Sequence, residues 1–232
     1  MARDYEQRCG LARGLDVLGE RWTLLIVREL LFGPKRFTDL LEGLPGVPPS
    51  LLSARLKEMQ TTGIVSKRVL PPPAASTVYE LTAVGKELER ILLALARWGA
   101  QFGRPPRQSD AARPEWTAFA LRSLFRPEAA AGVDVTCELR LPDVTFRLTV
   151  NDGVLTIDTG SDSSPDLVII GDLVTIMSAL MGRLPTREAV RRGDLKIQGD
   201  RKVLDRFLDM FRLVEGGVTK RVSESQGAGQ RT

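Results

Sequence analysis

The side chains that most often perform catalysis are scarce in this 232-residue sequence. It contains no histidine and two cysteines, Cys9 and Cys137. Without histidine there can be no Ser-His-Asp or Cys-His catalysis and no histidine-ligated metal site. Two cysteines are too few for a disulfide framework or a cysteine-only zinc site, and they are typical of a reducing compartment. The side chains left to consider for chemistry are the two thiols and the carboxylates.

Two acidic pairs could in principle support acid–base catalysis, but their spacing favours another role. Asp158 and Asp162 fall in a predicted turn, while Asp205 and Asp209 are an i, i+4 pair that is typical of a solvated helix face. No glycine-rich phosphate loop and no nucleophile elbow is present. We therefore expect neither enzymatic activity nor a cofactor.

The basic residues are distributed unevenly along the chain. Residues 1–104 hold 15 Lys and Arg against 11 Asp and Glu, whereas residues 105–232 hold 18 of each, so the net charge of +4 arises in the first half. A polyanionic partner would bind there. The polar N-terminus shows no secretory signal, and no apolar stretch reaches the ~20 residues that a membrane span needs. We expect a cytoplasmic protein without membrane contact.

The first half has a mostly helical hydrophobic pattern. The predicted helices cover residues 11–18, 22–32, 36–41, 51–61 and 83–102, and the predicted strands cover residues 64–70 and 77–81. Gly63 ends the fourth helix, and Thr82 is a suitable N-cap for the last one. Helices, a close-set helix pair, a hairpin and a long helix together predict a winged helix-turn-helix.

The second half has a mixed pattern. The predicted strands cover residues 133–140, 144–150, 154–158, 167–170 and 195–198, and the predicted helices cover residues 173–181 and 201–213. Asn151-Asp152-Gly153 predicts a hairpin turn. The polar, proline-containing residues 105–112 predict a linker, and residues 223–232 a disordered tail. The expected fold class is α+β, with domains at residues 1–104 and 113–222.

The predicted helix pair suggests where basic residues would meet DNA. The second helix of such a pair lies in the major groove, and the first crosses the phosphates. Leu52, Leu56 and Met59 would face the core. The candidate DNA-binding residues are Lys35, Arg36, Pro49, Ser50, Ser53, Arg55, Lys57, Lys67 and Arg68. Any one of these cations could be an ordinary solvated charge, so the hypothesis depends on their occurrence at three separate places.

Several motifs of the first half also resemble a known family. Residues 15–26 are similar to its Gly-Lys-Trp-Thr signature, with Glu20-Arg21 in place of Gly-Lys, and residues 32–37 to its Gly-x-x-Arg-Phe segment. Residues 52–59 resemble the family's recognition helix. Its second wing strand and the following helix start are similar to Tyr79-Glu80-Leu81-Thr82 with Gly85. The end of its dimerisation helix is similar to Trp98-Gly99. Residues 5–103 therefore resemble the HxlR family of MarR-like winged-helix transcriptional regulators. Loop 71–76 lacks the usual charged residue, which puts wing-tip contacts in doubt.

The resemblance implies double-stranded DNA and a second copy of the chain as partners. The predicted dimer surface on the long helix is formed by Leu88, Ile91, Leu92, Leu95 and Trp98. Cys9 falls where many family members carry a cysteine, which in some senses oxidants or electrophiles. Arg8, Arg13 and the nearby helix start could activate its thiol. A buried structural role for Cys9 is the alternative. Cys137 lies on the apolar face of a predicted strand and is expected in the core.

The second half resembles the C-terminal part of a sterol carrier protein type two domain, through segments such as residues 179–184 and 193–200. That fold implies an apolar ligand between a sheet and its helices. The predicted effector pocket comprises Ile176, Met177, Leu180, Met181, Leu184, Phe207, Met210 and Phe211. The same residues could simply fill a core. The expected function is a DNA-binding regulator that senses an apolar molecule; in the alternatives, the second domain is only an interaction or dimerisation module, or the signal is oxidation of Cys9.

Overall fold

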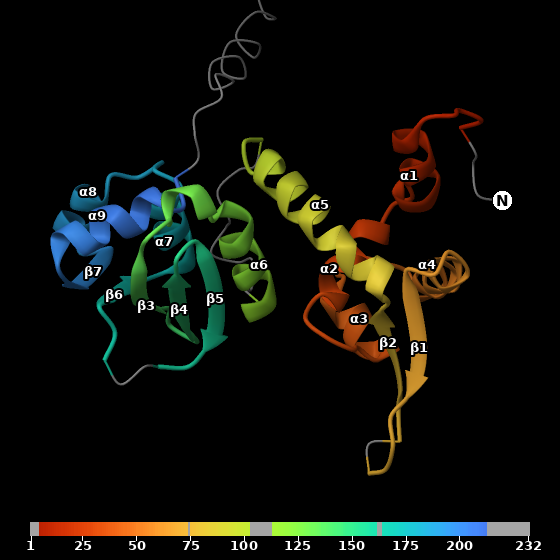
Figure 1. The fold of residues 1–232 in the computed structure, drawn as a ribbon. Helices are drawn as coiled ribbons and strands as arrows, with labels where there is room; N and C mark the ends of the chain where they lie inside the picture. The colour runs from red at the N-terminus through yellow and green to blue at the C-terminus, as the bar shows by residue number, and fades with distance from the viewer. Residues whose placement is uncertain (1–4, 74, 103–112, 162–163, 213–232) are drawn as a thin grey trace, which may run out of the picture. The chain divides into compact units, whose positions relative to one another are not determined.

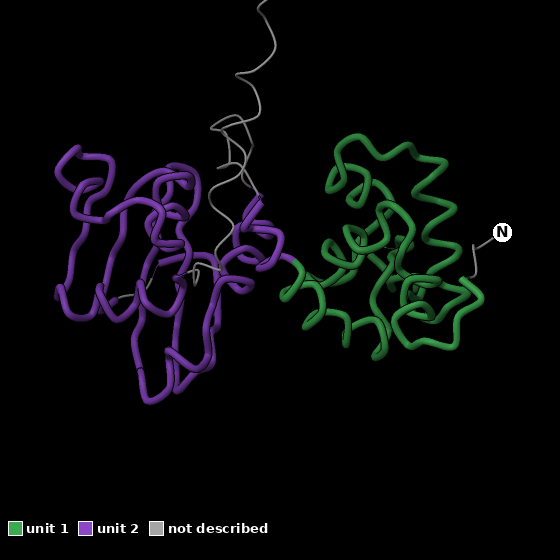
Figure 2. Tube along the Cα trace, turned by 90° about the horizontal axis from the view of Figure 1, so that it is seen from above, with its two compact units in different colours: residues 1–95 green, residues 96–232 purple. Residues whose placement is uncertain are grey.

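The computed structural model describes residues 5–73, 75–102, 113–161 and 164–212. The chain divides into two compact units, residues 1–95 and 96–232 (Figure 2). The predicted linker at residues 105–112 and the predicted tail at residues 223–232 lie outside the described residues. The proposed domain limits at residues 104 and 113 therefore stay predictions.

The first unit follows the predicted order of elements. It contains the helices α1 (Gly10–Leu18), α2 (Thr23–Leu30), α3 (Phe37–Gly43) and α4 (Pro49–Thr61), the strands β1 (Val65–Val69) and β2 (Thr77–Leu81), and most of helix α5 (Ala83–Gly99) (Figure 1). Helix α5 ends at Gly99, slightly before the predicted end at residue 102. The predicted winged helix-turn-helix plan is present.

The core of this unit holds α4 in place. Leu52, Leu56 and Met59 lie on one face of α4 and are at most 2% exposed, as are Ile26 of α2 and Leu40 of α3. Proline at the first helical position suits the start of α4, because its missing N–H would have no partner there. Truncating a leucine such as Leu56 to alanine would cost about 2–5 kcal/mol. The opposite face of α4 is left to solvent.

Helix α5 starts close against strand β1. The amide of Gly85 donates to the Thr82 hydroxyl over 3.1 Å, so Thr82 acts as the predicted N-cap. A Cβ atom at position 85 would lie 2.2 Å from the carbonyl oxygen of Ile64. Glycine therefore permits the close approach of the helix to the strand.

The wing is a two-stranded sheet with one additional backbone bridge. Strands β1 and β2 pair antiparallel, with Val65 opposite Leu81 and Val69 opposite Thr77. Lys35, just before α3, pairs with Tyr79 through two backbone hydrogen bonds of 2.9 and 2.8 Å. The wing is thereby fastened to the start of the helix pair.

The second unit contains a five-stranded mixed sheet. Its strands are β3 (Asp134–Arg140), β4 (Thr145–Asn151), β5 (Val154–Thr159), β6 (Leu167–Gly171) and β7 (Leu195–Gly199), and its helices are α6 (Pro114–Leu124), α7 (Leu173–Leu180), α8 (Thr186–Arg192) and α9 (Arg201–Asp209), with a 3-10 turn η1 (Pro127–Ala129) (Figure 1). The strand order is β5-β4-β3-β6-β7, in which only the β3–β6 pair is parallel. The predicted α+β fold class is confirmed.

One face of this sheet carries the core. Cys137, Leu148 and Leu167 are paired across neighbouring strands and are fully buried. They belong to one cluster with Leu121 of α6 and Phe207 of α9. The β4–β5 hairpin turns at Asp152-Gly153, both with positive φ, which is the backbone that an Asp-Gly turn provides. The prediction of a hairpin at this point is confirmed.

Two helices of the second unit were not predicted. Helix α6 begins at Pro114, right after the proposed linker, and α8 carries four charged residues in seven. Helix α8 has seven residues and buries only Ala189, so its apolar period is too weak to detect. Helix α6 has eleven residues and buries Phe119, Leu121 and Leu124, so its length does not explain why it was missed. None of the helices in the described ranges is long and apolar enough to cross a membrane.

Candidate nucleic-acid interface

Helix α4 has an exposed polar face. Pro49, Ser50, Ser53 and Lys57 are exposed, whereas the leucines on the other side are buried. The two serines lie in the first half of the helix, which is the part that reaches base edges when such a helix enters the major groove. The structure therefore has the predicted core face of α4 and an exposed polar face opposite it; contact of that face with DNA stays a prediction.

Basic residues lie on either side of α4 in the chain. Arg36 is exposed at the N-cap position of α3, and its backbone amide donates to the Asp39 carboxylate over 2.9 Å. Lys35 is half-buried and is fixed by its backbone pairing with Tyr79. Lys67 is exposed on β1. A phosphate contact needs such an exposed cation on a rigid element.

Arg68, the second predicted wing cation, is already paired. Its guanidinium binds the Glu80 carboxylate on β2 through hydrogen bonds of 3.1 and 3.0 Å. The hydrogen bond from Arg68 lowers the pKa of Glu80, and the same bond raises the pKa of Arg68. Because the pair is exposed, a phosphate could still compete for Arg68, but the positive charge offered to DNA here is reduced.

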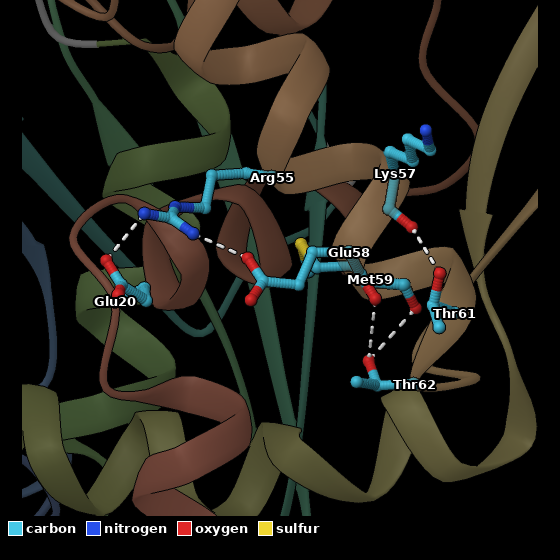
Figure 3. Close-up of polar contacts among 7 residues, drawn as sticks. All are labelled: Glu20, Arg55, Lys57, Glu58, Met59, Thr61 and Thr62. Carbon is cyan, nitrogen blue, oxygen red and sulfur yellow. Dashed lines mark hydrogen bonds and ion pairs between the residues drawn. The ribbon is translucent and has the colours of Figure 1, made fainter. Parts of the chain in front are cut away.

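Arg55 differs from the other predicted DNA-binding residues. It lies on α4, but its side chain is only 16% exposed. One terminal nitrogen of its guanidinium donates to Glu58 and the other to Glu20, each over 2.5 Å (Figure 3). The sequence analysis placed Arg55 among the cations that face the DNA groove. Local spacing shows that Glu58 is near Arg55 on the helix, but it cannot show the contact with Glu20, which is 35 residues away.

The two thiols have contrasting surroundings. Cys9 is exposed and directly precedes α1, where the backbone amides of Ala12 and Leu11 lower the pKa of its thiol. Cys137 is fully buried on β3, and burial, followed by the charge of Glu138, raises the pKa of its thiol well above the ordinary value. The prediction that Cys137 belongs to the core is confirmed. Cys9 has the exposure and helix-start position that a reactive thiol requires.

A largely apolar groove of about 620 Å³ lies on the first unit. Its walls come from α1, the turn between α1 and α2, α2 itself and α5; they include Leu11, Leu15, Leu25, Ile91 and Leu95. All five of these side chains are at least 41% exposed, and Leu11 reaches 72%. Sequence reasoning missed the contribution of α1, although Leu11 and Leu15 stand at helical spacing.

The predicted dimer surface on α5 needs one correction. Ile91, Leu95 and Trp98 are exposed, and Leu88 is half-buried, as an interface stripe requires. Leu92 is 4% exposed and belongs to the core of its own unit. The predicted stripe is too wide for all of its side chains to point outward. Leu92 therefore anchors the helix to its own unit, while Ile91 and Leu95 stay exposed for contact with a second copy.

The predicted effector residues all belong to, or pack against, one buried cluster. Ile176, Met177, Leu180, Met181, Phe207, Met210 and Phe211 are at most 8% exposed, and Leu184 is partly buried against them. The rings of Phe207 and Phe211 lie 5.1 Å apart. This burial is compatible with both a filled core and a ligand-lined cavity, so the pocket remains a prediction.

Among the described residues, no group of three or more ligating side chains could hold a metal ion. In the described part of the second unit, the carboxylate of Glu138 on β3 is fully buried and pairs with Arg140 over 2.7 Å. Because side chains alternate along a strand, this pair lies on the sheet face opposite Cys137. The Arg140 guanidinium neutralises the buried negative charge of Glu138.

Comparison with known proteins divides the chain in the same way. Residues 17–107 match the family model described as HxlR-like helix-turn-helix, and residues 125–216 match one described as alkyl sulfatase C-terminal. The HTH-type transcriptional regulator YodB of Bacillus subtilis is 37% identical over 90 residues, which are 39% of this chain and 80% of that protein. An uncharacterised HTH-type regulator of the same organism, YvaP, is 37% identical over 40% of this chain and 86% of its own length.

A solved structure of YodB in its reduced form is 33% identical to this chain, covers 44% of it and all of the YodB chain, and superimposes with a TM-score of 0.38. The HxlR-like match covers residues 17–107, and YodB and YvaP each match less than half of this chain. Since 37% identity extends over most of YodB and of YvaP, the chain belongs to the HxlR-like helix-turn-helix family.

Proposed function

We propose that this protein is a sequence-specific, double-stranded-DNA-binding transcriptional regulator and not an enzyme. The observation that carries the proposal is helix α4, whose buried leucines fix it while Pro49, Ser50, Ser53 and Lys57 face solvent. Arg36 and Lys67 supply cations from two other elements, as phosphate neutralisation requires. Its relatives YodB and YvaP are named as transcriptional regulators, which agrees with this role.

The regulator acts as a homodimer. The groove formed by α1, α2 and α5 leaves Leu11, Ile91 and Leu95 exposed, and an apolar surface of this kind is costly to leave in water. A second copy placed on it would bury these side chains and bring two α4 helices together. Two-fold symmetry implies an operator with two half-sites spaced by about one helical turn or a multiple of it.

Fluorescence anisotropy with the full chain tests the DNA-binding function. Wild-type protein should bind a duplex that it has selected from a random pool more tightly than unrelated duplexes by roughly 10³-fold or more. Affinity should fall steeply between about 50 and 200 mM salt, since several phosphates are contacted. Equal affinity for all duplexes would contradict sequence-specific recognition.

The second unit, in this proposal, is a sterol-carrier-like domain that senses an apolar molecule. Met177 and Met181 at α7 and Phe207 on α9 come together against the sheet, and methionine side chains adapt to varied ligand shapes. The candidate ligand classes are lipids and aromatic metabolites. Thermal-shift measurements on the full chain with myristate and with 1-naphthol test the idea, and Met177→Ala should abolish any shift observed.

The alternative is a second unit that only binds proteins or assists dimerisation. In that case no apolar compound would raise the melting temperature, and removing residues 105–232 would change the oligomeric state or the partner set. Under the sensing proposal, the same deletion leaves operator binding intact and abolishes its response to ligand.

A further candidate signal is oxidation of Cys9. Its exposed thiol at the start of α1, with a lowered pKa, favours reaction with oxidants or electrophiles. Helix α1 lines the groove, so a modified Cys9 would act next to the proposed dimer surface. Operator binding that responds to diamide in wild type but not in Cys9→Ser would support this signal, and an equal response in both would exclude it.

A further inference from the structure

The short turn between α1 and α2 is hydrogen-bonded to the recognition helix and lies close to the loop that precedes it. Glu20 in this turn accepts a hydrogen bond from Arg55, in the middle of α4, over 2.5 Å (Figure 3). The ring of Trp22, the residue that caps α2, lies 4.0 Å from where a Cβ of Gly46 would be, in the loop that leads into α4. The observed link between the turn and α4 is therefore the hydrogen bond between Glu20 and Arg55.

The ion pairs of Arg55 oppose a direct role in DNA binding. The guanidinium donates to two carboxylates, Glu20 and Glu58, while its Nε is buried with no hydrogen-bond partner among the described residues. One cation beside two carboxylates offers no net positive charge to a phosphate. A contact with DNA would require breaking two short ion pairs of a guanidinium that is only 16% exposed. Lys57, two residues further along α4, is exposed and is better placed for that task.

The same turn follows α1 directly, through the Gly19 amide that donates to the Leu15 carbonyl over 2.7 Å, and it forms part of the groove wall. Gly19 ends α1 at a point where a Cβ would lie 2.5 Å from the Leu15 carbonyl oxygen. Trp22 adopts a left-handed backbone with φ of 81°, and the Arg21 guanidinium lies 5.3 Å from the centre of its ring. Glu20, Arg21 and Trp22 all line the groove proposed to receive the second copy.

We propose that Arg55 is a positioning residue, which ties α4 through Glu20 to the wall of the dimer groove and so sets the angle at which α4 meets DNA. The idea rests on the proposed DNA-binding function and deepens it. Packing of a second copy against the groove holds the α1–α2 turn, and the Arg55–Glu20 ion pair transmits that constraint to the recognition helix.

A double-mutant cycle tests this role. The variants are Glu20→Gln, Arg55→Met and the two combined, with Lys57→Ala as the control on the same helix. Binding to the duplex selected by wild type is measured by anisotropy across a salt series. Glu20→Gln and Arg55→Met should each weaken binding roughly tenfold, and the double variant should be no weaker than Arg55→Met, because both remove one link. Neither should change the salt slope, whereas Lys57→Ala should lower it by about 1.

The opposite sign overturns the proposal. If Glu20 merely restrains a phosphate-binding arginine, then Glu20→Gln should tighten binding, and Arg55→Met should lower the salt slope by about 1. Additive effects of the two substitutions would also refute a single link. Far-UV circular dichroism checks that Arg55→Met is folded. Glu20 is 39% exposed, so Glu20→Gln should fold and decides the question even if Arg55→Met unfolds. Failure of wild type to prefer any duplex would instead refute the proposed function itself.

Discussion

The two units of this chain differ in where their informative side chains lie. In the first unit they are exposed around a small core: serines and lysines on α4 and the wing, and leucines along the groove. In the second unit the predicted effector residues are buried among one another. An exposed residue needs a functional explanation when it is one of a constellation, whereas a buried apolar residue is already explained by packing. Placement alone therefore supports the DNA-binding proposal more strongly than the sensing proposal.

The largest effect should come from Phe207→Ala in the second unit. Phe207 is fully buried and packs against Phe211, so truncation should lower the free energy of unfolding of this unit by about 3–5 kcal/mol. Chemical denaturation followed by circular dichroism measures the loss, with the exposed Val154→Ala as control. Operator affinity in native buffer should stay within twofold of wild type. A loss below about 1 kcal/mol would indicate a residue lining an open cavity and would strengthen the sensing proposal.

A charge in the groove should separate the two copies. Ile91→Asp places a carboxylate among the exposed apolar side chains of α5 and α1, and sedimentation velocity at micromolar concentration should then show a monomer. Operator affinity should fall by at least about tenfold, because one half-site is lost. Val84→Asp changes an equally exposed α5 residue that does not line the groove, and it should leave both properties unchanged. A dimer that persists in Ile91→Asp would place the interface elsewhere.

The cations around α4 should differ in their contribution to binding. Arg36→Ala and Lys67→Ala should each weaken binding to every duplex and lower the salt slope by about 1, since each removes a phosphate contact. Arg68→Ala should have a smaller effect, because Glu80 already neutralises Arg68. Anisotropy titrations at several salt concentrations measure the slopes. Three equal slope changes would show that DNA displaces Glu80 from Arg68.

The smallest effect concerns the thiols and leaves the native fold unchanged. Iodoacetamide should modify Cys9 and spare Cys137, since the first thiol is exposed with a lowered pKa and the second is buried with a raised one. The rate at Cys9 should reach half its maximum below the ordinary cysteine value of about pH 8.5. Mass spectrometry across a pH series measures this. Modification of Cys137 at the same rate would mean that the second unit opens readily.

Sequence periodicity predicted the elements that bury a regular apolar stripe, and failed where contacts join distant segments. The strand pattern of residues 133–150 alternates cleanly, and β3 and β4 lie there. Helix α8 buries one alanine and gives no comparable pattern. Leu92 shares the apolar character of Ile91 and Leu95, so only its position in the fold shows that it points inward.

The candidate site was predictable to a similar degree. The exposed face of α4 follows from the positions of Leu52, Leu56 and Met59, because helical spacing places the serines opposite them. The pairing of Arg55 with Glu20 spans 35 residues and depends on how the α1–α2 turn packs against α4, which no local pattern encodes. The groove formed by α1, α2 and α5 also requires the tertiary structure.

Selection of duplexes from a random pool, by wild type, Ser53→Ala and Arg36→Ala in parallel, tests the central claim that α4 reads the operator. Wild type and Arg36→Ala should enrich the same pseudo-palindromic sequence, because a phosphate contact carries no base preference. Ser53→Ala should alter the preferred base at matching positions of both half-sites, at a cost of about 1–3 kcal/mol per altered pair. An unchanged preference in Ser53→Ala together with a changed one in Arg36→Ala would contradict the placement of the recognition helix.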